Sequence, residues 1–486
     1  MSKNYKVQNK HIVKFAVMSV IGLFLFVALL PDGEGSFNIP LGFAINWLGA
    51  TLNSVQIGGF GLVFYIAATL ITISYFGSVA VAAFKPQFAM DSEWLKGIFL
   101  CHPVYFVSKG IAVILVWMVY FGVGPDFIIG WDGATLMMDL IASSSGLIVI
   151  FLVLGITIPL LTDFGIMEFL GVLVRKVVRF LFTLPGRSSI DLMGSWFSSS
   201  AAGVIITRDQ HEKGFYTGRE AAAICVNFTF VSLPFTFVIA QTIGLVPHFL
   251  VFYLVICITV IILAVLMPRI WPLRGMKDEY LPDVGKQIEE EPPANVSLFS
   301  QATRLAAFKA SGTTPVGVIK SGLSNWLSIF MDLIPFILAW GTIALIINEQ
   351  TPIFELISFP FGLFLTILGV EYGAQYASTT IVGFIDMYLP ALMLRGREAI
   401  YTGDIEAYVA GYGYGFERVG EFVVPAATRF ILGALSIVQI IYMAETGILI
   451  LKSKIPLNIG HLAIIFLMRT AIALPIIVLL TRLMFR

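Results

Sequence analysis

The stretch 192–206, LMGSWFSSSAAGVII, decides the fold because it places a tryptophan and a group of serines between two apolar runs. A turn signal, Pro-Gly-Arg at 185–187, precedes it, and the charged string TRDQHEKG at 207–214 follows it. The middle is apolar enough to enter a bilayer, but it is shorter than the ~20 residues that a helix needs to cross one. We therefore predict a re-entrant hairpin that enters the membrane and returns to the same side.

The tip of such a hairpin is a candidate solute site. A re-entrant segment leaves main-chain groups unpaired at its tip, which is tolerated only where protein or a water-filled cavity satisfies them. The residues of this segment that we assign to the solute site are Ser195, Trp196, Ser198, Ser199 and Ser200. The same small residues would also let two helices pack closely, so this stretch by itself supports both interpretations.

Composition places the hairpin in a membrane protein. The 486 residues are 58% hydrophobic and 12% charged, with a mean hydropathy of +0.91. Several apolar segments exceed the length needed to cross ~30 Å of hydrocarbon, which predicts a polytopic helical protein. About nine full spans are expected, at 12–30, 57–84, 98–121, 135–162, 219–244, 247–267, 326–347, 424–451 and 459–483. Shorter or broken apolar stretches lie at 186–207, 352–370 and 371–394.

The positions of basic residues predict how the chain is oriented. Residues 1–14 are basic, and Lys85 and Lys96 lie on the same predicted side. The loops 31–38 and 122–133 on the other side contain no lysine or arginine. Because basic residues concentrate in cytoplasmic loops, we expect the N-terminus to lie inside the cell.

The segment 163–184 is predicted to lie flat on the inner membrane face. Glu168, Gly171, Arg175 and Arg179 recur on one helical face, and apolar residues cover the other. The alternative is a short span whose two arginines extend to the interface. That alternative would place a basic cluster outside, against the charge rule.

The longest polar stretch divides the chain into two halves. It lacks apolar periodicity, which predicts a flexible cytoplasmic linker. The predicted organisation is N-terminal transmembrane helices at 1–134, a first repeat with the interfacial helix and hairpin at 135–267, the linker at 268–314, and a second repeat with a hairpin at 315–486.

The second half contains a matching interrupted segment, GVEYGAQYASTTIVGFIDMYLP at 369–390. The residues of this segment that we assign to the solute site are Glu371, Gln375, Ser378, Thr379, Thr380 and Asp386. Paired interrupted segments in two halves are typical of transporter sites built from inverted repeats. We therefore predict an all-α polytopic membrane protein with inverted repeats, two re-entrant hairpins and an interfacial helix.

A speculative sodium site follows the first hairpin in the string NFTFVSLP. Pro234 frees main-chain carbonyl groups, which could hold an ion together with Asn227, Thr229 and Ser232. The alternative is a proline kink whose polar groups simply repair the helix.

No catalytic or metal-binding pattern is visible in the sequence. It lacks a nucleophile triad and a phosphate-binding loop, and the three cysteines show no metal-ligand spacing. We therefore expect neither an enzyme nor a bound metal or other cofactor. Ionisable residues inside spans are better candidates, since leaving one uncompensated costs ~3 kcal/mol or more. They include Lys109, Glu220, Arg429, Glu445 and Arg469, and some must find partners on other segments.

Three blocks of sequence carry a resemblance to a known family. They are GSWFSSSAAGVIITRDQHEKGFYTGREAA (194–222), ASTTIVGFIDMYLPA (377–391) and RFILGALSIVQIIYMAETGILILKSKIPL (429–457). The chain resembles the YjiH-type branch of the bacterial nucleoside recognition, or Gate-domain, membrane proteins over most of its length. The wider superfamily includes concentrative nucleoside transporters and spore maturation proteins. Similarity to the transporter fold implies an interfacial helix, a hairpin and two crossing helices in each repeat. Residues 395–422 are extra to that pattern.

These observations predict a multi-pass protein of the bacterial cytoplasmic membrane that transports a small polar solute, such as a nucleoside, by alternating access. Sodium ions or protons are the expected coupling ions, and Glu371 or Asp386 could titrate. The expected partners are the solute and membrane lipids, without nucleic acid, in a homo-oligomer or a complex with a second Gate-domain protein. The alternative function is a membrane scaffold or subunit that transports nothing alone.

Overall fold

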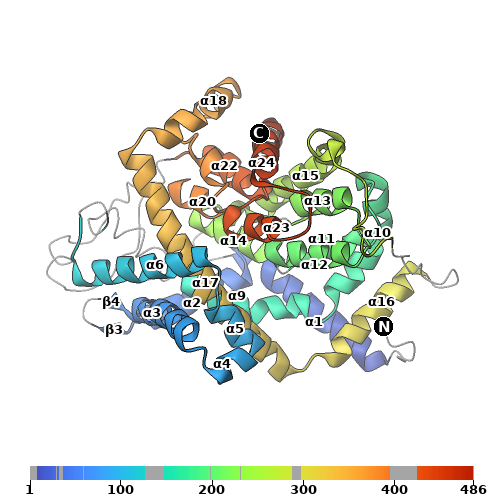
Figure 1. Cartoon of the computed structure of the whole chain (residues 1–486), viewed down its shortest axis with the longest axis horizontal. Helices are drawn as coiled ribbons and strands as arrows, with labels where there is room; N and C mark the ends of the chain where they lie inside the picture. The colour runs from blue at the N-terminus through green and yellow to red at the C-terminus, as the bar shows by residue number, and fades with distance from the viewer. Residues whose placement is uncertain are drawn as a thin grey trace.

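The computed structural model describes residues 8–28, 30–31, 37–57, 60–125, 128, 147–197, 199–229, 231–286, 297–394 and 424–484. Helices dominate these residues (Figure 1). The described strands form two short antiparallel pairs, β1 (Leu30–Pro31) with β2 (Phe37–Asn38) and β3 (Gln56–Ile57) with β4 (Phe60–Gly61). Ser198, the start of the predicted span 135–162 and the predicted extra segment 395–422 lie outside the described residues.

Apolar helices confirm a multi-pass membrane protein. Seven stretches of the described residues are long and apolar enough to cross a membrane. They contain α1 (Asn9–Val27), α3 (Leu62–Phe84), α6 (Pro103–Phe121), α15 (Phe249–Leu266), part of α17 (Pro315–Gln350), α22 (Ala426–Val438) and α24 (Ile459–Met484). The predicted span 219–244 is instead two short helices, α13 (Gly218–Asn227) and α14 (Leu233–Thr242).

Thirteen further helices of the described residues are short. They are α2 (Pro40–Asn53), α4 (Gln87–Asp91), α5 (Glu93–Phe99), α11 (Ser188–Phe197), α12 (Ser200–Glu212), η2 (Val246–His248), η3 (Met267–Arg269), η4 (Leu273–Gly275), α18 (Ile353–Ile367), α19 (Thr379–Val382), α20 (Leu389–Leu394), η5 (Met443–Gly447) and α23 (Ile448–Leu451).

A sharp bend separates the predicted interfacial helix from the preceding span. Helices α9 (Leu147–Thr162) and α10 (Ile166–Phe182) meet at 56°. Gly165 makes the bend with a φ of 100°, and a Cβ there would lie 2.6 Å from the main-chain oxygen of Ala306. Glycine is the residue that accepts both conditions. Phe180, 82% exposed, lies on the outer face of α10. The bend shows that α10 does not continue straight on from α9.

Helix α16 (Leu298–Gly312) differs from the expectation of a flexible linker over 268–314. Ala302, Ala306 and Ala310 are fully buried, and their spacing of four places them on one helical face. The helix packs against α10 and α1. Because the small alanine side chains give a weak hydropathy signal, the hydropathy of the sequence does not reveal this apolar face.

Helices α9 and α17 touch through their backbones. A Cβ on Gly155 of α9 would lie 2.9 Å from the main-chain oxygen of Gly322 on α17, and a Cβ on Gly322 would clash with Gly155 in return. Helix α17 also packs against α6 and α3. Figure 1 shows α3 to α6 on one side of the molecule, with α10 to α15, α22 and α24 on the other.

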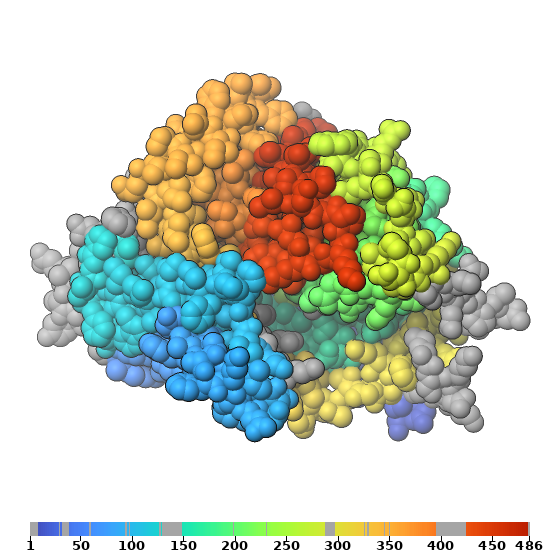
Figure 2. Space-filling view, in the orientation of Figure 1, coloured from blue at the N-terminus to red at the C-terminus, as the bar shows by residue number. Residues whose placement is uncertain are grey.

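Two hairpins lie in the second side of the molecule. Hairpin 1, which we define as α11 and α12, packs so closely that a Cβ on Gly203 would clash with the hydroxyl of Ser195. Its arms of 10 and 13 residues are too short to cross a bilayer. Hairpin 2 comprises 370–394 and includes α19 and α20. The C-terminal residues, red in Figure 2, pack between the orange and yellow-green parts of the chain.

Candidate functional site

Two interrupted helices bring main-chain polar groups to the centre of the molecule. Helix α13 ends at Asn227, and α14 begins at Leu233. Helix α22 ends at Val438, and η5 begins at Met443. We call these interruptions the first break and the second break. Because the last carbonyl groups of a helix have no partner within it, each break needs donors from elsewhere.

One guanidinium group satisfies both helix ends. Arg469 on α24 is fully buried. Its Nη1 donates to the main-chain oxygen of Val226 at 3.0 Å and to Oδ1 of Asn227 at 2.7 Å. Its Nη2 donates to the main-chain oxygen of Val438 at 2.8 Å. The positive charge thus lies where the dipoles of α13 and α22 both end, which is the favourable position for a cation.

A carboxylate connects the tip of hairpin 1 to the second break. Glu445 in η5 accepts a hydrogen bond from the Ser200 hydroxyl at 2.7 Å and another from the main-chain N–H of Ala201 at 3.2 Å. Ser199 caps α12 by accepting from the N–H of Ala202 at 3.2 Å. The carboxylate therefore occupies the positive end of the α12 dipole.

Hairpin 2 is attached to the same break through main-chain groups. The N–H of Met443 donates to the oxygen of Phe384 at 2.9 Å, and the N–H of Ala444 donates to the oxygen of Ile385 at 3.0 Å. Two irregular segments thus satisfy each other's backbone, which is the requirement for non-helical chain at membrane depth.

Gln439 adds a side-chain connection between hairpin 2 and its surroundings. Its amide nitrogen donates to the main-chain oxygen of Thr380 and to the hydroxyl of Thr470, each at 2.8 Å. A Cβ on Gly383 would clash with the amide oxygen of Gln439, so a larger residue at 383 would displace this amide. The side chain is fully buried.

Two acceptor atoms at this centre lack partners. Asp386 is 1% exposed, and its Oδ1 accepts from the N–H of Tyr388 at 2.8 Å. Within the described chain, its Oδ2 and the Oε1 of Gln439 are buried without a hydrogen-bond partner. Asp386 and Glu445 are also close enough to repel each other when both are charged. Buried acceptors without a donor are unusual in folded proteins, so these two atoms distinguish the centre from the well-paired groups around it.

The structure separates the predicted site residues of hairpin 1. Ser199 and Ser200 lie at the tip, as described above. Ser195 lies inside the hairpin and donates to the main-chain oxygen of Asp191 at 3.2 Å. Trp196 points away from the centre. Its ring nitrogen donates to the Tyr253 hydroxyl on α15.

The predicted residues of hairpin 2 are also divided. Glu371 and Gln375 are exposed, whereas Ser378, Thr379 and Thr380 are buried. The hydroxyls of the two threonines donate to carbonyl oxygens three residues earlier, each at 2.7 Å. Hairpin 2 therefore contributes to the centre through Asp386 and main-chain oxygens.

The three predicted sodium ligands are already engaged or enclosed. Asn227 donates to the oxygen of Ala223 at 2.8 Å and accepts from Arg469. Thr229 donates to a carbonyl oxygen one turn earlier in the chain, and Ser232 is buried. The cation at the first break is thus the guanidinium of Arg469. Gln439 was not predicted, although a lone amide in an apolar run is a signal that could have identified it.

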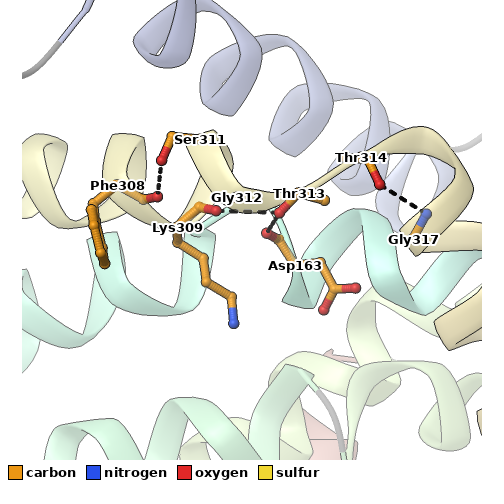
Figure 3. Close-up of a pocket in the computed structure, with 8 residues that line it drawn as sticks. All are labelled: Asp163, Phe308, Lys309, Ser311, Gly312, Thr313, Thr314 and Gly317. Atoms are coloured by element: carbon orange, nitrogen blue, oxygen red, sulfur yellow. Dashed lines mark hydrogen bonds between the residues drawn. The ribbon is translucent and has the colours of Figure 1, made fainter.

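A separate pocket of about 570 Å³ lies beside the bend between α9 and α10 (Figure 3). It is lined by Asp163, Phe308, Lys309, Ser311, Gly312, Thr313, Thr314 and Gly317. The hydroxyl of Thr313 donates to the main-chain oxygen of Asp163 at 2.6 Å. None of the predicted site residues lines this pocket. In the described part of the chain, no group of three or more metal-ligating side chains occurs.

This chain is similar to a family model, to a bacterial protein and to a solved structure. The family model described as Gate, nucleoside recognition, matches residues 144–246, which include hairpin 1 and the first break. An uncharacterized protein of Alkalihalophilus pseudofirmus is 39% identical over 477 residues, which cover 97% of this chain and 95% of that protein. A solved structure of a CNTnw variant in an outward-facing state is 13% identical, with a TM-score of 0.44 and coverage of 98% of both chains.

Proposed function

We propose, on the premise that this chain belongs to the nucleoside recognition (Gate) family, that it is a secondary transporter that moves a nucleoside-like solute across the membrane by alternating access. We place the solute where the two hairpins meet the two breaks. We also propose that the protein lies in the bacterial cytoplasmic membrane with its N-terminus in the cytoplasm, on the basis of the basic residues near the first spans.

The unpartnered acceptors at the centre carry this proposal. Oδ2 of Asp386 and Oε1 of Gln439 are buried without partners among the residues described. A buried acceptor without a donor destabilises the protein, so a solute that supplies donors gains affinity there. The ribose hydroxyls and base N–H groups of a nucleoside are such donors.

Hairpin 1 is the element that would open to admit the solute. Its tip is connected to the second break through Glu445, which receives the Ser200 hydroxyl and the Ala201 N–H. A solute hydroxyl can replace the serine hydroxyl on that carboxylate, so solute binding and hairpin closure compete for one acceptor. A solute that favours one hairpin position shifts the population of states toward it.

Coupling to protons is favoured over coupling to sodium. The main-chain oxygen of Val226 and the amide oxygen of Asn227, which a sodium ion at the first break would need, are bound by Arg469. Buried carboxylates are available to exchange protons instead.

Uptake of radiolabelled uridine by proteoliposomes tests the proposal. We expect saturable uptake by the wild-type protein and at least about a tenfold loss in Asp386→Ala, equivalent to ~1.4 kcal/mol of binding. Glu371→Ala, which removes an exposed carboxylate from the same hairpin, is the matched control and should retain uptake.

Two results would contradict this function. Equal loss in both variants would remove Asp386 from the site. A folded wild-type protein that neither transports nor binds uridine, adenosine or other nucleosides would instead support the alternative of a membrane scaffold acting with a second Gate-domain protein.

A further inference from the structure

The base of hairpin 1 encloses a carboxylate that the proposed solute site does not use. Asp191 on α11 is 1% exposed. Neither of its carboxylate oxygens has a hydrogen-bond partner among the residues that the structure describes. It lies about two helical turns before the tip of the hairpin. An enclosed acid group in the proposed moving element therefore lacks a structural explanation.

The groups that face Asp191 come from three elements besides its own helix. They are the Thr207 hydroxyl on α12, the Tyr216 hydroxyl in the link between α12 and α13, and the Cys225 thiol on α13. Arg187, which directly precedes α11, is the cation that acts electrostatically on Asp191, although no ion pair joins the two in the described chain. Its guanidinium lies 3.8 Å from the ring centroid of Phe215.

The other elements packed on α11 bring no charge to this place. Helices α9, α10 and α14 contact α11, but the described residues on them present no charged group to Asp191. The salt bridges of the described chain do not include Asp191 either. The carboxyl group is thus faced mainly by neutral groups that can exchange or share a proton.

A buried histidine extends this cluster toward the end of the hairpin. His211 on α12 is 1% exposed, and its Nδ1 lies 2.9 Å from the main-chain oxygen of Tyr216. Its Nε2 has no partner in the described structure. Tyr216 thus contacts the histidine through its carbonyl group and faces Asp191 through its hydroxyl.

We propose that Asp191 is a proton-binding site that couples the movement of hairpin 1 to proton transfer, an inference that rests on the proposed transport function. An ionised carboxylate enclosed without a paired cation is strongly disfavoured, so Asp191 holds a proton in this conformation. Tyr216 and Cys225 lie beyond the hairpin. Displacing hairpin 1 from them opens the enclosure, and the proton then passes from the carboxyl oxygen to water.

Infrared spectroscopy tests the proton site without any solute. We expect wild-type protein in lipid to show the carbonyl band of a protonated carboxyl group that is diminished in Asp191→Asn. Asp209→Asn is the matched control, since Asp209 lies on the same hairpin, is 43% exposed and pairs with Arg208. An unchanged band in folded Asp191→Asn protein would overturn the proposal. Asp191→Glu, which keeps a carboxyl group, should restore the band.

Uridine transport tests the coupling. We expect an inward proton gradient to drive uridine accumulation in the wild type and in Asp209→Asn. In Asp191→Asn, this accumulation should fall about tenfold, while exchange of internal for external uridine continues. Gradient-driven accumulation that persists in Asp191→Asn, or that depends on sodium alone, would overturn the coupling. A wild type that moves no uridine in either mode would overturn the proposed function and the coupling with it, whereas the infrared result decides the proton site independently.

Discussion

Hairpin 1 and hairpin 2 both reach the centre of the molecule, but they are attached to it in different ways. Hairpin 2 joins the second break through main-chain hydrogen bonds from Met443 and Ala444. Hairpin 1 joins the same break through the side chain of Glu445. Main-chain pairs hold two segments in register, whereas a solute hydroxyl can displace a side-chain contact. On the proposed function, hairpin 2 is therefore expected to stay fixed and hairpin 1 to move.

Removal of the Arg469 guanidinium, which lies between the two breaks, is expected to have the largest effect on stability. Arg469→Ala should lower the free energy of unfolding by ~3 kcal/mol or more, because three buried acceptors each lose a partner at ~1–3 kcal/mol. Thermal unfolding of the purified protein in detergent measures it. Arg482→Ala on the same helix is the control, since Arg482 is exposed and donates to Leu368 and Gly369. Equal melting temperatures for the two variants would show that the breaks are held by other contacts.

A second variant tests how firmly hairpin 2 is fixed. Gln439→Leu leaves the main-chain oxygen of Thr380 without its amide donor, so we expect a loss of ~1–3 kcal/mol in unfolding free energy. Gln375→Leu, an exposed change in hairpin 2, should have little effect. The same thermal measurement applies. If Gln439→Leu unfolds like the wild type, the Gln439 amide does not help to hold hairpin 2 in place.

Because hairpin 1 is attached through Glu445, loss of this side chain should expose the hairpin tip. The change in stability should be smaller than for Arg469→Ala. Glu445→Ala removes the acceptor for the tip, so a cysteine placed at Ser199 in a cysteine-free background should react faster with a soluble maleimide. We expect a loss of stability of ~1–3 kcal/mol, since the Ser200 hydroxyl and the Ala201 N–H lose their acceptor. Glu355→Ala, an exposed change, is the control. An unchanged labelling rate in Glu445→Ala would mean that Glu445 does not hold the hairpin.

Ser200→Ala should have the smallest effect of the four. It removes one hydrogen bond to Glu445 and leaves the one from the Ala201 N–H, so a loss of ~1 kcal/mol is expected. The KM for uridine should change more than the melting temperature if the solute uses the same carboxylate. Ser195→Ala, inside hairpin 1, should leave KM unchanged. The reverse order of KM effects would place the solute within the hairpin.

Local patterns explain the parts of the fold that the sequence predicted. Hairpin 1 follows a turn signal and is too short to span, and the interfacial helix has one charged face. Helix α16 was missed because its buried face is made of Ala302, Ala306 and Ala310, whose small side chains give a weak hydropathy signal. The spacing of four residues between these alanines is the sequence signal that indicates one helical face.

The site was harder to predict because its contacts are long-range. The sequence indicated that Glu445 and Arg469 need partners on other segments. It gave no means to pair them with Ser200 and Asn227, which are 245 and 242 residues away. Glu371 was grouped with the site by its position in an interrupted segment, but turns rather than a helix precede α19 and leave it exposed.

The contact between Gly155 and Gly322 leaves no space for a side chain between α9 and α17. Two helices that touch through main-chain atoms can neither roll nor slide by a turn without a collision, because any side chain that turned into the seam would meet a backbone. On the proposed function, α9 and α17 are therefore expected to keep their relative position while the solute crosses the membrane, and other parts of the molecule are expected to move.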